Sequence, residues 1–427
     1  MEEKKSFHKG WYKLDNAAKI FPGQNSAKWS NIFRVTAVLK EPVDPEMLQK
    51  ALCRVMPRFP CFKVKMKNGF FWHYFAENEK PAPPLCEDIK NPCHRIKFKE
   101  NDGYLLRVYY LGCRVSVDTY HALCDGYGST VFLCTLMGEY FRLQGNAIPC
   151  NEYVLNPDEP AAPHELEDSF AASADSRAGY KRRDHFCYHP IGTPMPAHTV
   201  NITAGTLSFR ALHDITAAKG VTVTEYLAAV LIKIHMEKQA AEKRRQKEVS
   251  VQVPINLRRT FGSRTLRNFS VCLRTKIDPN LGEYSFDEIL RHVALQLRLA
   301  NDRHDLNALI TANLKLERNP LLKVTPLPVK DFGTRISFLI TGEQTTTALL
   351  TNLGAVTLPE ALQARMDRLF LMPGPGIRNA ARCGVSTLGD KLVITFCNTF
   401  RENDLERAFF TFLVRQGLHV SIESNRT

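Results

Sequence analysis

The sequence predicts a mixed α/β protein built from two halves of similar size. Segments with strand character alternate with amphipathic helical segments along most of the chain. A chain of 427 residues is too long for one ordinary hydrophobic core, so two domains are expected. A proline-rich segment over 157–200 separates the two alternating regions. We therefore assign 1–156 to an N-terminal subdomain, 157–200 to a crossover, and 201–427 to a C-terminal subdomain.

The first elements follow from local signals. Residues 32–40 are rich in Val and Phe and predict a strand. Asp44 as N-cap and Pro45 in the first turn predict the start of a helix, which Pro57 ends. Further strands are expected near 70–75, 105–111 and 114–120. The first half therefore begins with strand, helix and a run of three strands.

A long helix is expected after the strand at 114–120. Ser129 or Thr130 can cap it, its apolar stripe continues to Leu143, and Gly145 can close it. The loop between this strand and this helix is short and rich in glycine. Such a loop can present a reactive side chain on rigid supports.

The second half repeats the alternation. Capping boxes at Thr222–Glu225 and Ser285–Glu288 predict two helix starts. The last helix is expected to open at Asn403 and to end before Gly417. Strands are expected at 249–255, 335–341, 348–352, 392–397 and 418–422.

The balance of charge is basic, with a net charge of +13 and a sequence pI near 9.2. Many of the Lys and Arg residues fall within 243–274. Such a cluster fits nucleic acid, a phosphate-rich cofactor, an anionic membrane surface or a solvated basic face. The sequence has no helix-turn-helix, zinc-finger or ribonucleoprotein motif, so we expect no nucleic-acid partner.

Compartment and redox state are predicted from what the sequence lacks. No stretch approaches 18 consecutive apolar residues, and the first residues have no apolar signal-peptide core. The 12 cysteines are scattered without a C-x-x-C pair, which argues against a structural zinc site. We expect a cytoplasmic protein with reduced thiols, no bound metal and no transmembrane segment. Peripheral contact with a membrane remains open.

One loop carries a pattern that predicts specific chemistry. Within 120–128, His121 is followed after three residues by Asp125 and Gly126. Gly126 and Gly128 are expected to permit backbone conformations that other residues resist. A neutral imidazole, with an unperturbed pKa of about 6.5, can accept the proton of an attacking hydroxyl. We assign His121 as the candidate general base.

Residue type alone leaves two alternatives open beside His121. Asp125 has the character of a triad partner for the imidazole. Cys124 has the character of a nucleophile in a Cys-His pair. Cys124 stands at an unspecified position of the motif, however, so we disfavour a covalent role for it.

The chain resembles a bacterial branch of the chloramphenicol acetyltransferase-like superfamily, the alcohol acetyltransferases. Plant BAHD acyltransferases and the condensation domains of peptide synthetases are related to this branch. Four segments carry the likeness in the family order: 11–19, 121–126, 253–259 with 267–269, and 351–354. The chain departs from the pattern at Tyr120, where many relatives have a second histidine. The Asp-Phe-Gly run at 331–333 lies upstream of the plant motif's place, so we treat it as coincidence.

The resemblance implies a fold and an activity. The fold would be two chloramphenicol acetyltransferase-like subdomains, each a mixed sheet with flanking helices, with a tunnel between them. The activity would be direct transfer of an acyl group from acyl-CoA to an acceptor hydroxyl, with His121 as general base. Asp125 would point away from the histidine and pair with Arg258, or alternatively with Arg259. Together with Gly126, this pair would hold the motif loop in shape.

The remaining expectations concern ligands. Thr351 and Asn352 are candidate donors to the oxyanion of the tetrahedral intermediate. Acyl-CoA is expected as co-substrate, with no permanently bound cofactor. The basic cluster at 243–274 is the region for its phosphates, without individual assignments. The acceptor is expected to be a small alcohol or amine, and the protein a monomer.

Two further readings stay open. The same fold would serve an N-acyltransferase, or a condensation reaction in which an acyl carrier protein is the donor. A reading from another class is a non-catalytic protein that binds an acyl ligand or acts as a regulator. The intact motif from His121 to Gly126 argues against the non-catalytic reading.

Overall fold

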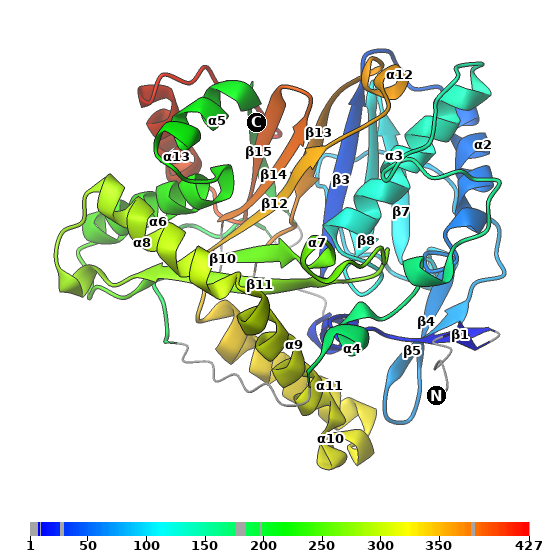
Figure 1. Ribbon diagram of the computed structural model, residues 1–427, viewed down its shortest axis with the longest axis horizontal. Coiled ribbons are helices and arrows are strands. Elements are labelled where there is room, and N and C mark those ends of the chain that lie inside the picture. Colours follow the sequence, from blue (N-terminus) through cyan, green and yellow to red (C-terminus); the bar gives the residue numbers. More distant parts are fainter. Residues whose placement is uncertain are drawn as a thin grey trace.

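The computed structural model describes residues 7–8, 10–25, 30–175, 185–196, 199–376 and 381–426. Two halves lie side by side, each with a mixed sheet and flanking helices (Figure 1). This arrangement confirms the predicted α/β class, with a mixed sheet and flanking helices in each half. One large apolar core lies in each half.

The N-terminal half holds a five-stranded sheet in the order β13-β3-β8-β7-β6. Its strands are β3 (Ile32–Leu39), β6 (Cys86–Glu87), β7 (Leu106–Leu111), β8 (Arg114–Tyr120) and β13 (Met366–Met372). A smaller sheet is made of β1 (Phe7–His8), β2 (Trp11–Lys13), β4 (Val64–Asn68) and β5 (His73–Glu77). The helices of this half are α1 (Phe21–Gln24), α2 (Pro45–Val55), α3 (Gly126–Leu143) and α12 (Glu360–Gln363), which comes late in the chain but packs on α3 and β13.

The C-terminal half holds a seven-stranded sheet in the order β11-β10-β12-β14-β15-β9-β16. Its strands are β9 (Asn201–Ser208), β10 (Val249–Asn256), β11 (Ser270–Ile277), β12 (Ala348–Val356), β14 (Ala381–Leu388), β15 (Lys391–Asn398) and β16 (Ser421–Ser424). Its helices are α4 (Ser169–Ser173), α5 (Phe209–Ala218), α6 (Val223–Ala241), α7 (Arg258–Phe261), α8 (Phe286–Ala300), α9 (Arg303–Arg318), α10 (Pro320–Val324), α11 (Leu327–Ser337) and α13 (Asp404–Arg415). α4 belongs to this half because it packs on α9 and its Phe170 lies in the C-terminal core.

One strand connects the two halves. β13 comes late in the chain, yet it pairs antiparallel with β3 at the edge of the N-terminal sheet. The hydroxyl of Ser386, in β14, donates to the carbonyl oxygen of Leu369, in β13, at 2.7 Å. β13 is therefore fastened to both sheets. Sequence reasoning assigned no strand to these residues.

The capping signals that the sequence carries are present at several helix starts. The Asp44 carboxylate accepts from two backbone amides at the start of α2. Capping boxes open α6 at Thr222 and α8 at Ser285. Each of these starts satisfies backbone donors that an uncapped helix would leave unpaired.

Four expectations about elements are wrong. The helix after β8 begins at Gly126, because the Asp125 carboxylate rather than Ser129 or Thr130 caps it. Residues 70–72 form the turn between β4 and β5, closed by a bond from the Gly69 amide to the Trp72 carbonyl oxygen at 3.0 Å. The final strand covers 421–424 instead of 418–422. The last helix does open at Asn403 as expected, because Asn403 holds the N-cap position of α13, although its side chain makes no capping bond.

The fourth correction concerns 335–341, which the sequence predicted as a strand. These residues continue α11 into a turn of π-helix over Phe338–Glu343. Apolar residues at alternate positions 336, 338 and 340 imitate the period of a strand. Among the described residues no single helix is long and apolar enough to cross a membrane, and α5 with α6 passes that test only as a pair bent by 83°.

Candidate active site

His121 lies directly after β8, where the strand gives way to the loop that leads to α3. Its backbone amide donates to the Asn31 carbonyl oxygen at 2.8 Å, which continues the pairing with the β3 segment. The imidazole stacks on Phe21 of α1, with ring centroids 4.6 Å apart, and also contacts Phe33 of β3 at 5.0 Å. Two aromatic rings therefore fix the plane of the imidazole while part of the residue stays accessible.

Asn268 fixes the orientation of the imidazole through one of its nitrogens. The Nδ1 atom of His121 lies 3.2 Å from Oδ1 of Asn268. The Asn268 amide nitrogen donates to Oδ2 of Asp15 at 3.3 Å and faces the Ala122 carbonyl oxygen at 3.5 Å. Because that nitrogen faces two acceptors, the amide oxygen faces the imidazole and accepts from Nδ1. The basic lone pair is then on Nε2.

The surroundings keep His121 neutral. Burial lowers the pKa of the imidazole below its usual value of 6.5, because it disfavours the charged form. Asp125 and the bond to Asn268 oppose that shift without cancelling it. A neutral imidazole with its lone pair on Nε2 is the form that accepts a proton.

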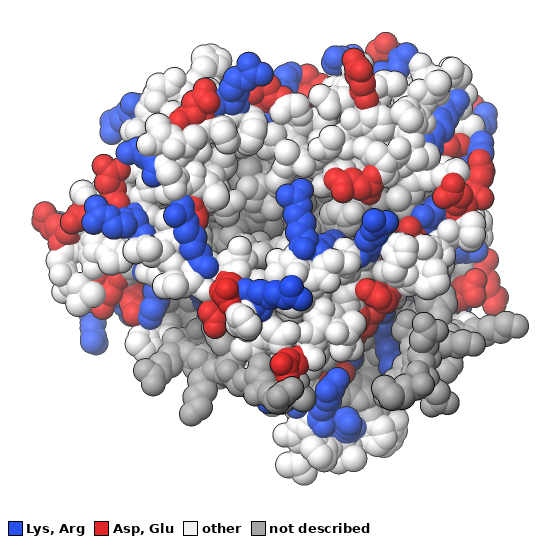
Figure 2. Space-filling view, viewed as in Figure 1, with Lys and Arg blue, Asp and Glu red and all other residues white. Residues whose placement is uncertain are grey.

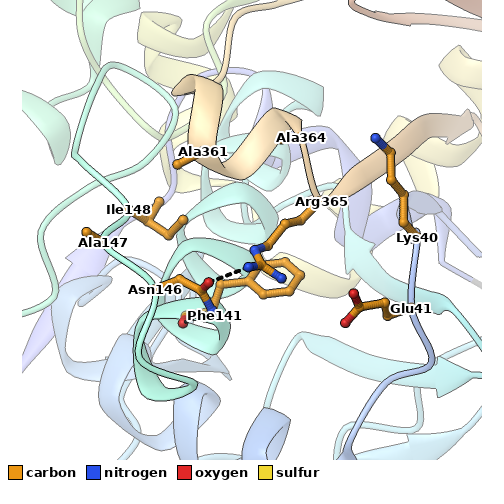
Figure 3. Close-up of a pocket in the computed structure, with 9 residues that line it drawn as sticks. All are labelled: Lys40, Glu41, Phe141, Asn146, Ala147, Ile148, Ala361, Ala364 and Arg365. Carbon is orange, nitrogen blue, oxygen red and sulfur yellow. Dashed lines mark hydrogen bonds between the residues drawn. The ribbon is translucent and has the colours of Figure 1, made fainter.

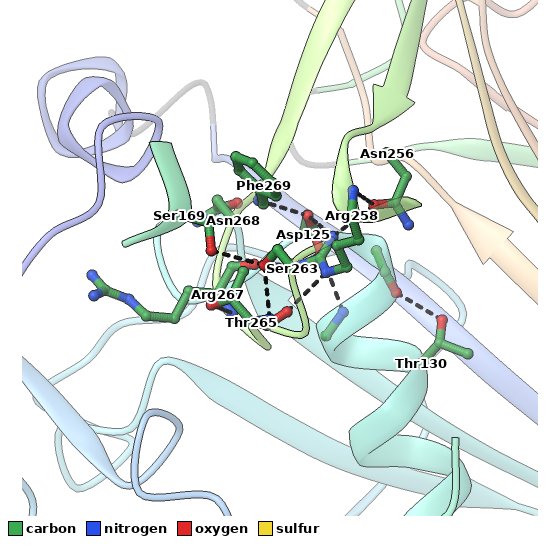
Figure 4. A network of polar contacts seen from close by, with 12 residues as sticks. Asp125, Thr130, Ser169, Asn256, Arg258, Ser263, Thr265, Arg267, Asn268 and Phe269 are labelled. Carbon is green, nitrogen blue, oxygen red and sulfur yellow. Dashed lines mark hydrogen bonds and ion pairs between the residues drawn. The ribbon is translucent and has the colours of Figure 1, made fainter. Parts of the chain in front are cut away.

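Asp125 faces the C-terminal half, where it meets Arg258 at the start of α7 (Figure 4). Arg258 Nη1 donates to Oδ2 of Asp125 at 2.8 Å, and Nη2 donates to Oδ1 at 3.1 Å. The Phe269 amide adds a bond at 2.9 Å and the Gly128 amide one at 3.2 Å. We call the ion pair of Asp125 and Arg258 the clasp. It joins the motif loop to the second half.

Arg258 is saturated within the clasp. Its Nε donates to the Thr265 carbonyl oxygen at 2.8 Å, and its Nη2 donates to the Arg267 carbonyl oxygen at 2.6 Å. The guanidinium also stacks over the Tyr127 ring, 4.4 Å from its centroid. Both side chains of the clasp are below one-tenth exposed. Arg259, the alternative partner, is exposed.

The two glycines of the motif are required for space rather than for unusual backbone angles, which corrects the sequence expectation. Neither Gly126 nor Gly128 has a positive φ. A Cβ at Gly128 would lie 2.1 Å from the Leu266 carbonyl oxygen, and one at Gly126 would lie 2.8 Å from Leu353 Cδ2. The requirement is strict at Gly128, which faces backbone of the 263–269 segment, and weaker at Gly126, which faces the end of the flexible Leu353 side chain.

Cys124 is fully buried between His121 and Asp125. Burial raises the pKa of its thiol well above the usual value, and the charge of Asp125 acts in the same direction. The thiolate is the nucleophilic form of cysteine. A buried, protonated thiol is a poor nucleophile, which agrees with the sequence argument against a covalent role.

Thr351 and Asn352 lie in β12. Leu353, the residue after Asn352 in the same strand, contacts Gly126. The Asn352 side chain is engaged within the C-terminal half. Its amide nitrogen donates to Thr224 Oγ1 at 3.0 Å, and its oxygen accepts from the Gly354 amide at 2.8 Å. Asn352 thereby supports the irregular register between β12 and β14. An oxyanion role for either residue stays a prediction.

Sequence reasoning assigned no role to two residues behind His121. Asn268 was noted only as part of a family-like segment, and Asp15 only as part of the opening segment. Asp15 accepts from the Ala18 amide at 2.8 Å and lies 3.7 Å from Arg267 Nε. Burial raises the pKa of its carboxyl group to about 6, against the pull of Arg267. Their only sequence signal was that each lies in one of the segments that resemble the family, 11–19 and 267–269.

The basic cluster at 243–274 does not form one surface. Arg258 and Arg267 are buried, whereas Arg259 and Arg264 are exposed on and just after α7. Figure 2 shows the displayed face hollowed above β10, between the two halves, with Lys and Arg side chains at its edge. The tunnel that the family resemblance implies stays a prediction.

A surface pocket lies elsewhere in the N-terminal half (Figure 3). It has a volume of about 390 Å³, and Arg365 crosses it to bond Asn146. Phe141 lines it at the C-terminal end of α3, whereas His121 precedes the N-terminal end. With a rise of about 1.5 Å per residue, the helix separates the two by roughly 20 Å. The pocket is therefore not part of the site around His121.

Comparison with known proteins rests on structure. No family model matches the sequence, and no curated relative is found. The chain is similar to polyketide synthase associated protein 5 from Mycobacterium tuberculosis, with a TM-score of 0.61 and 13% identity over 97% of this chain and 98% of that one. It is also similar to F. graminearum TRI101 complexed with coenzyme A and T-2 mycotoxin, with a TM-score of 0.62 and 11% identity over 96% and 99%.

The chain has the chloramphenicol acetyltransferase-like fold. A third similar structure is the starter condensation domain of the rhizomide synthetase RzmA in complex with C8-CoA, with a TM-score of 0.60 and 13% identity over 95% of this chain and 94% of that one. The chain thus spans nearly the whole of all three proteins. This result confirms the fold that the sequence segments indicated.

Proposed function

We propose that this protein is an acyl-CoA-dependent O-acyltransferase that uses His121 as its general base. One observation carries the proposal: a neutral imidazole directs its basic Nε2 away from Asn268 and is held between two aromatic rings. Similarity to TRI101 complexed with coenzyme A and to a condensation domain with C8-CoA supports a thioester donor.

The reaction balances with His121 as the only proton carrier. Nε2 takes the proton of the acceptor hydroxyl while its oxygen forms a bond to the thioester carbonyl carbon. The tetrahedral intermediate collapses and the carbon–sulfur bond breaks. The imidazolium returns the proton to the departing thiolate, which leaves as free thiol. The products are an ester and coenzyme A, and no covalent enzyme intermediate forms.

Other residues would support this reaction indirectly. The clasp of Asp125 and Arg258 keeps the motif loop against the second half, and Asn268 keeps Nδ1 protonated. Thr351, two residues before the Leu353 that contacts Gly126, is the better-placed of the two oxyanion candidates because the Asn352 amide is already engaged. Each of these residues would help to hold Nε2 of His121 and the reacting groups in position.

The phosphates of coenzyme A require a basic site at the seam between the halves. Arg259 and Arg264 are exposed beside the buried clasp and are the candidates. An Arg259→Ala/Arg264→Ala variant should raise KM for acyl-CoA about tenfold and leave KM for an acyl-pantetheine, which lacks the nucleotide, unchanged. Arg245→Ala, at an exposed arginine in the loop after α6, is the matched control. Equal increases for both donors would exclude a phosphate role.

The activity itself is tested by thiol release from acetyl-CoA and longer acyl-CoAs, with panels of alcohols and amines. We expect release that depends on an alcohol and disappears in His121→Ala. Release only with amines would make the protein an N-acyltransferase. Release only from an acyl carrier protein would make it a condensation-type enzyme, an outcome that the similarity to the RzmA domain favours as second candidate. If no donor gives thiol release that depends on His121, the acyltransferase proposal is wrong.

A further inference from the structure

Large apolar side chains are exposed together at one end of the molecule. Leu321 and Val324 of α10 are 76% and 65% exposed, and Val329 and Phe332 of α11 are 60% and 66% exposed. Phe70, in the turn between β4 and β5, is 74% exposed. We call these five residues, with Ile336, the apolar tip. A monomeric soluble protein rarely leaves a contiguous group of this kind uncovered.

The apolar tip includes a regular helix face. Val329, Phe332, Ile336 and Ile340 recur at intervals of three and four residues, so they form one stripe along α11 and the turn after it. The opposite face packs on α1, where a Cβ at Gly23 would lie 2.9 Å from the Asp331 carbonyl oxygen. Amphipathic helices normally direct the apolar stripe to the core. α11 instead directs its apolar stripe outward, and its opposite face packs against α1.

The turn between β4 and β5 is joined to the same surface. The Leu327 amide donates to the Phe70 carbonyl oxygen at 3.0 Å. The Lys330 ammonium donates to the Phe71 carbonyl oxygen at 2.8 Å and lies 3.5 Å from the centroid of the Trp72 ring. Figure 1 places this turn beside α10 and α11 at the lower end of the molecule. The apolar tip is therefore one surface made from two distant parts of the sequence.

Basic residues surround the apolar tip. Those within residues 315–335 are Lys315, Arg318, Lys323, Lys330 and Arg335. The same stretch, 315–335, has two acidic residues, and both are engaged, Glu317 in an ion pair with Lys19 and Asp331 in hydrogen bonds with His73. In Figure 2 the projecting lower end is mostly uncharged, with Lys and Arg side chains beside it. The surface is thus apolar at its centre and positively charged around it.

We propose that the apolar tip docks the protein on an anionic lipid bilayer. Apolar side chains on a helix that lies in the interface enter the boundary between headgroups and acyl chains, and surrounding Lys and Arg contact lipid phosphates. Projecting Phe and Leu at separate points suit a soft surface better than a rigid protein groove, and the excess of positive charge selects anionic lipid. The proposal does not depend on the proposed activity.

Docking would place the bilayer next to the helix that contacts His121. α11 packs on α1 at Gly23, and Phe21 of the same short helix stacks on the imidazole. An amphipathic acceptor or donor held in the bilayer would then be close to the site. Binding to vesicles can be measured without any substrate, so failure of this proposal and failure of the acyltransferase proposal are distinguishable.

The test is flotation of the full-length protein with vesicles of phosphatidylcholine alone and of phosphatidylcholine with phosphatidylglycerol. The test variant is Leu321→Ser/Phe332→Ser. The matched control is Leu281→Ser, because Leu281 is 77% exposed and is not part of the apolar tip. We expect flotation only with the anionic vesicles, a loss of at least about tenfold in the test variant, wild-type behaviour in the control, and weaker binding at high salt. The melting temperature of all three proteins should agree, since the changed side chains are exposed.

Three outcomes would overturn the proposal. The first is no flotation with either vesicle. The second is equal flotation of the wild type and the test variant. The third is a dimer in sedimentation velocity that the test variant abolishes while no protein floats, which would make the apolar tip an interface between two copies.

Discussion

His121 and Asp125 stand four residues apart in one loop, yet their surroundings are opposite. The Asp125 carboxylate accepts from four donors and is locked against Arg258. The imidazole of His121 has Asn268 on one nitrogen and aromatic rings at its sides. The comparison teaches that one motif contains a structural carboxylate and a reactive base, and that spacing alone makes them resemble a catalytic pair.

Removal of the base should have the largest effect on activity. His121→Ala should lower kcat by about 10²–10⁴-fold, the usual contribution of a general base, and change the melting temperature little. Cys124→Ala serves as the control and should keep near-wild-type turnover. The measurement is thiol release under saturating donor. A comparable loss of turnover in Cys124→Ala would instead support Cys124 as a covalent nucleophile.

Removal of the carboxylate should act on stability. Asp125→Asn leaves a buried Arg258 without its counter-charge, which costs about 3–5 kcal/mol of unfolding free energy. Urea denaturation measures this loss. An Asp125→Asn/Arg258→Met double variant should recover part of it, because no buried charge is left. A well-folded Asp125→Asn protein without activity would contradict the structural role.

Asn268 lies between the two cases, since it holds the base without taking part in the chemistry. Asn268→Ala removes one hydrogen bond of about 1 kcal/mol, so kcat should fall by roughly two- to tenfold. The bond favours the protonated imidazole, so its loss should lower the pKa of His121 further. The acidic limb of the kcat profile should move to lower pH. A loss of kcat without that movement would mean that Asn268 supports only the fold.

The smallest expected effect is the pH dependence of kcat/KM in the wild-type protein. His121 acts when it is deprotonated, so kcat/KM should rise as pH increases through the pKa of its imidazole. Burial lowers that pKa, which places the rise below the ordinary value of 6.5. A pH profile of kcat/KM checks this. A rise centred above 6.5 would show that neighbouring charge dominates over burial.

Local signals in the sequence predicted most elements around the site, but not the contacts between distant segments. The caps at Asp44, Thr222 and Ser285 depend on neighbours within three residues, and such patterns are readable. The pairing of Asp125 with Arg258 was expected only from the family resemblance. Asn268 received no role because its contact with His121 spans 147 residues.

The strand wrongly expected at 335–341 has a different cause. The apolar residues of this segment fit the two-residue period of a strand as well as the period of a helix. The burial pattern normally decides between the two. Here Ile336 and Ile340 are exposed and Phe338 is only half-buried, so core packing does not decide between the two periods. β13 was missed because its partner, β3, lies more than 300 residues earlier in the chain. Pairing over such a distance leaves no local pattern.

The pairing of β13 with β3 also has a consequence for biosynthesis. Until the ribosome has made Met372, the N-terminal sheet lacks its edge strand and β3 has an open edge. At about 5–20 residues per second, that interval lasts roughly 20–70 s after β3 is complete. A nascent chain or a truncated N-terminal half therefore presents an apolar, unpaired strand to chaperones and to other nascent chains. A strand from the last seventh of the sequence therefore decides whether the sheet of the first half is ever completed.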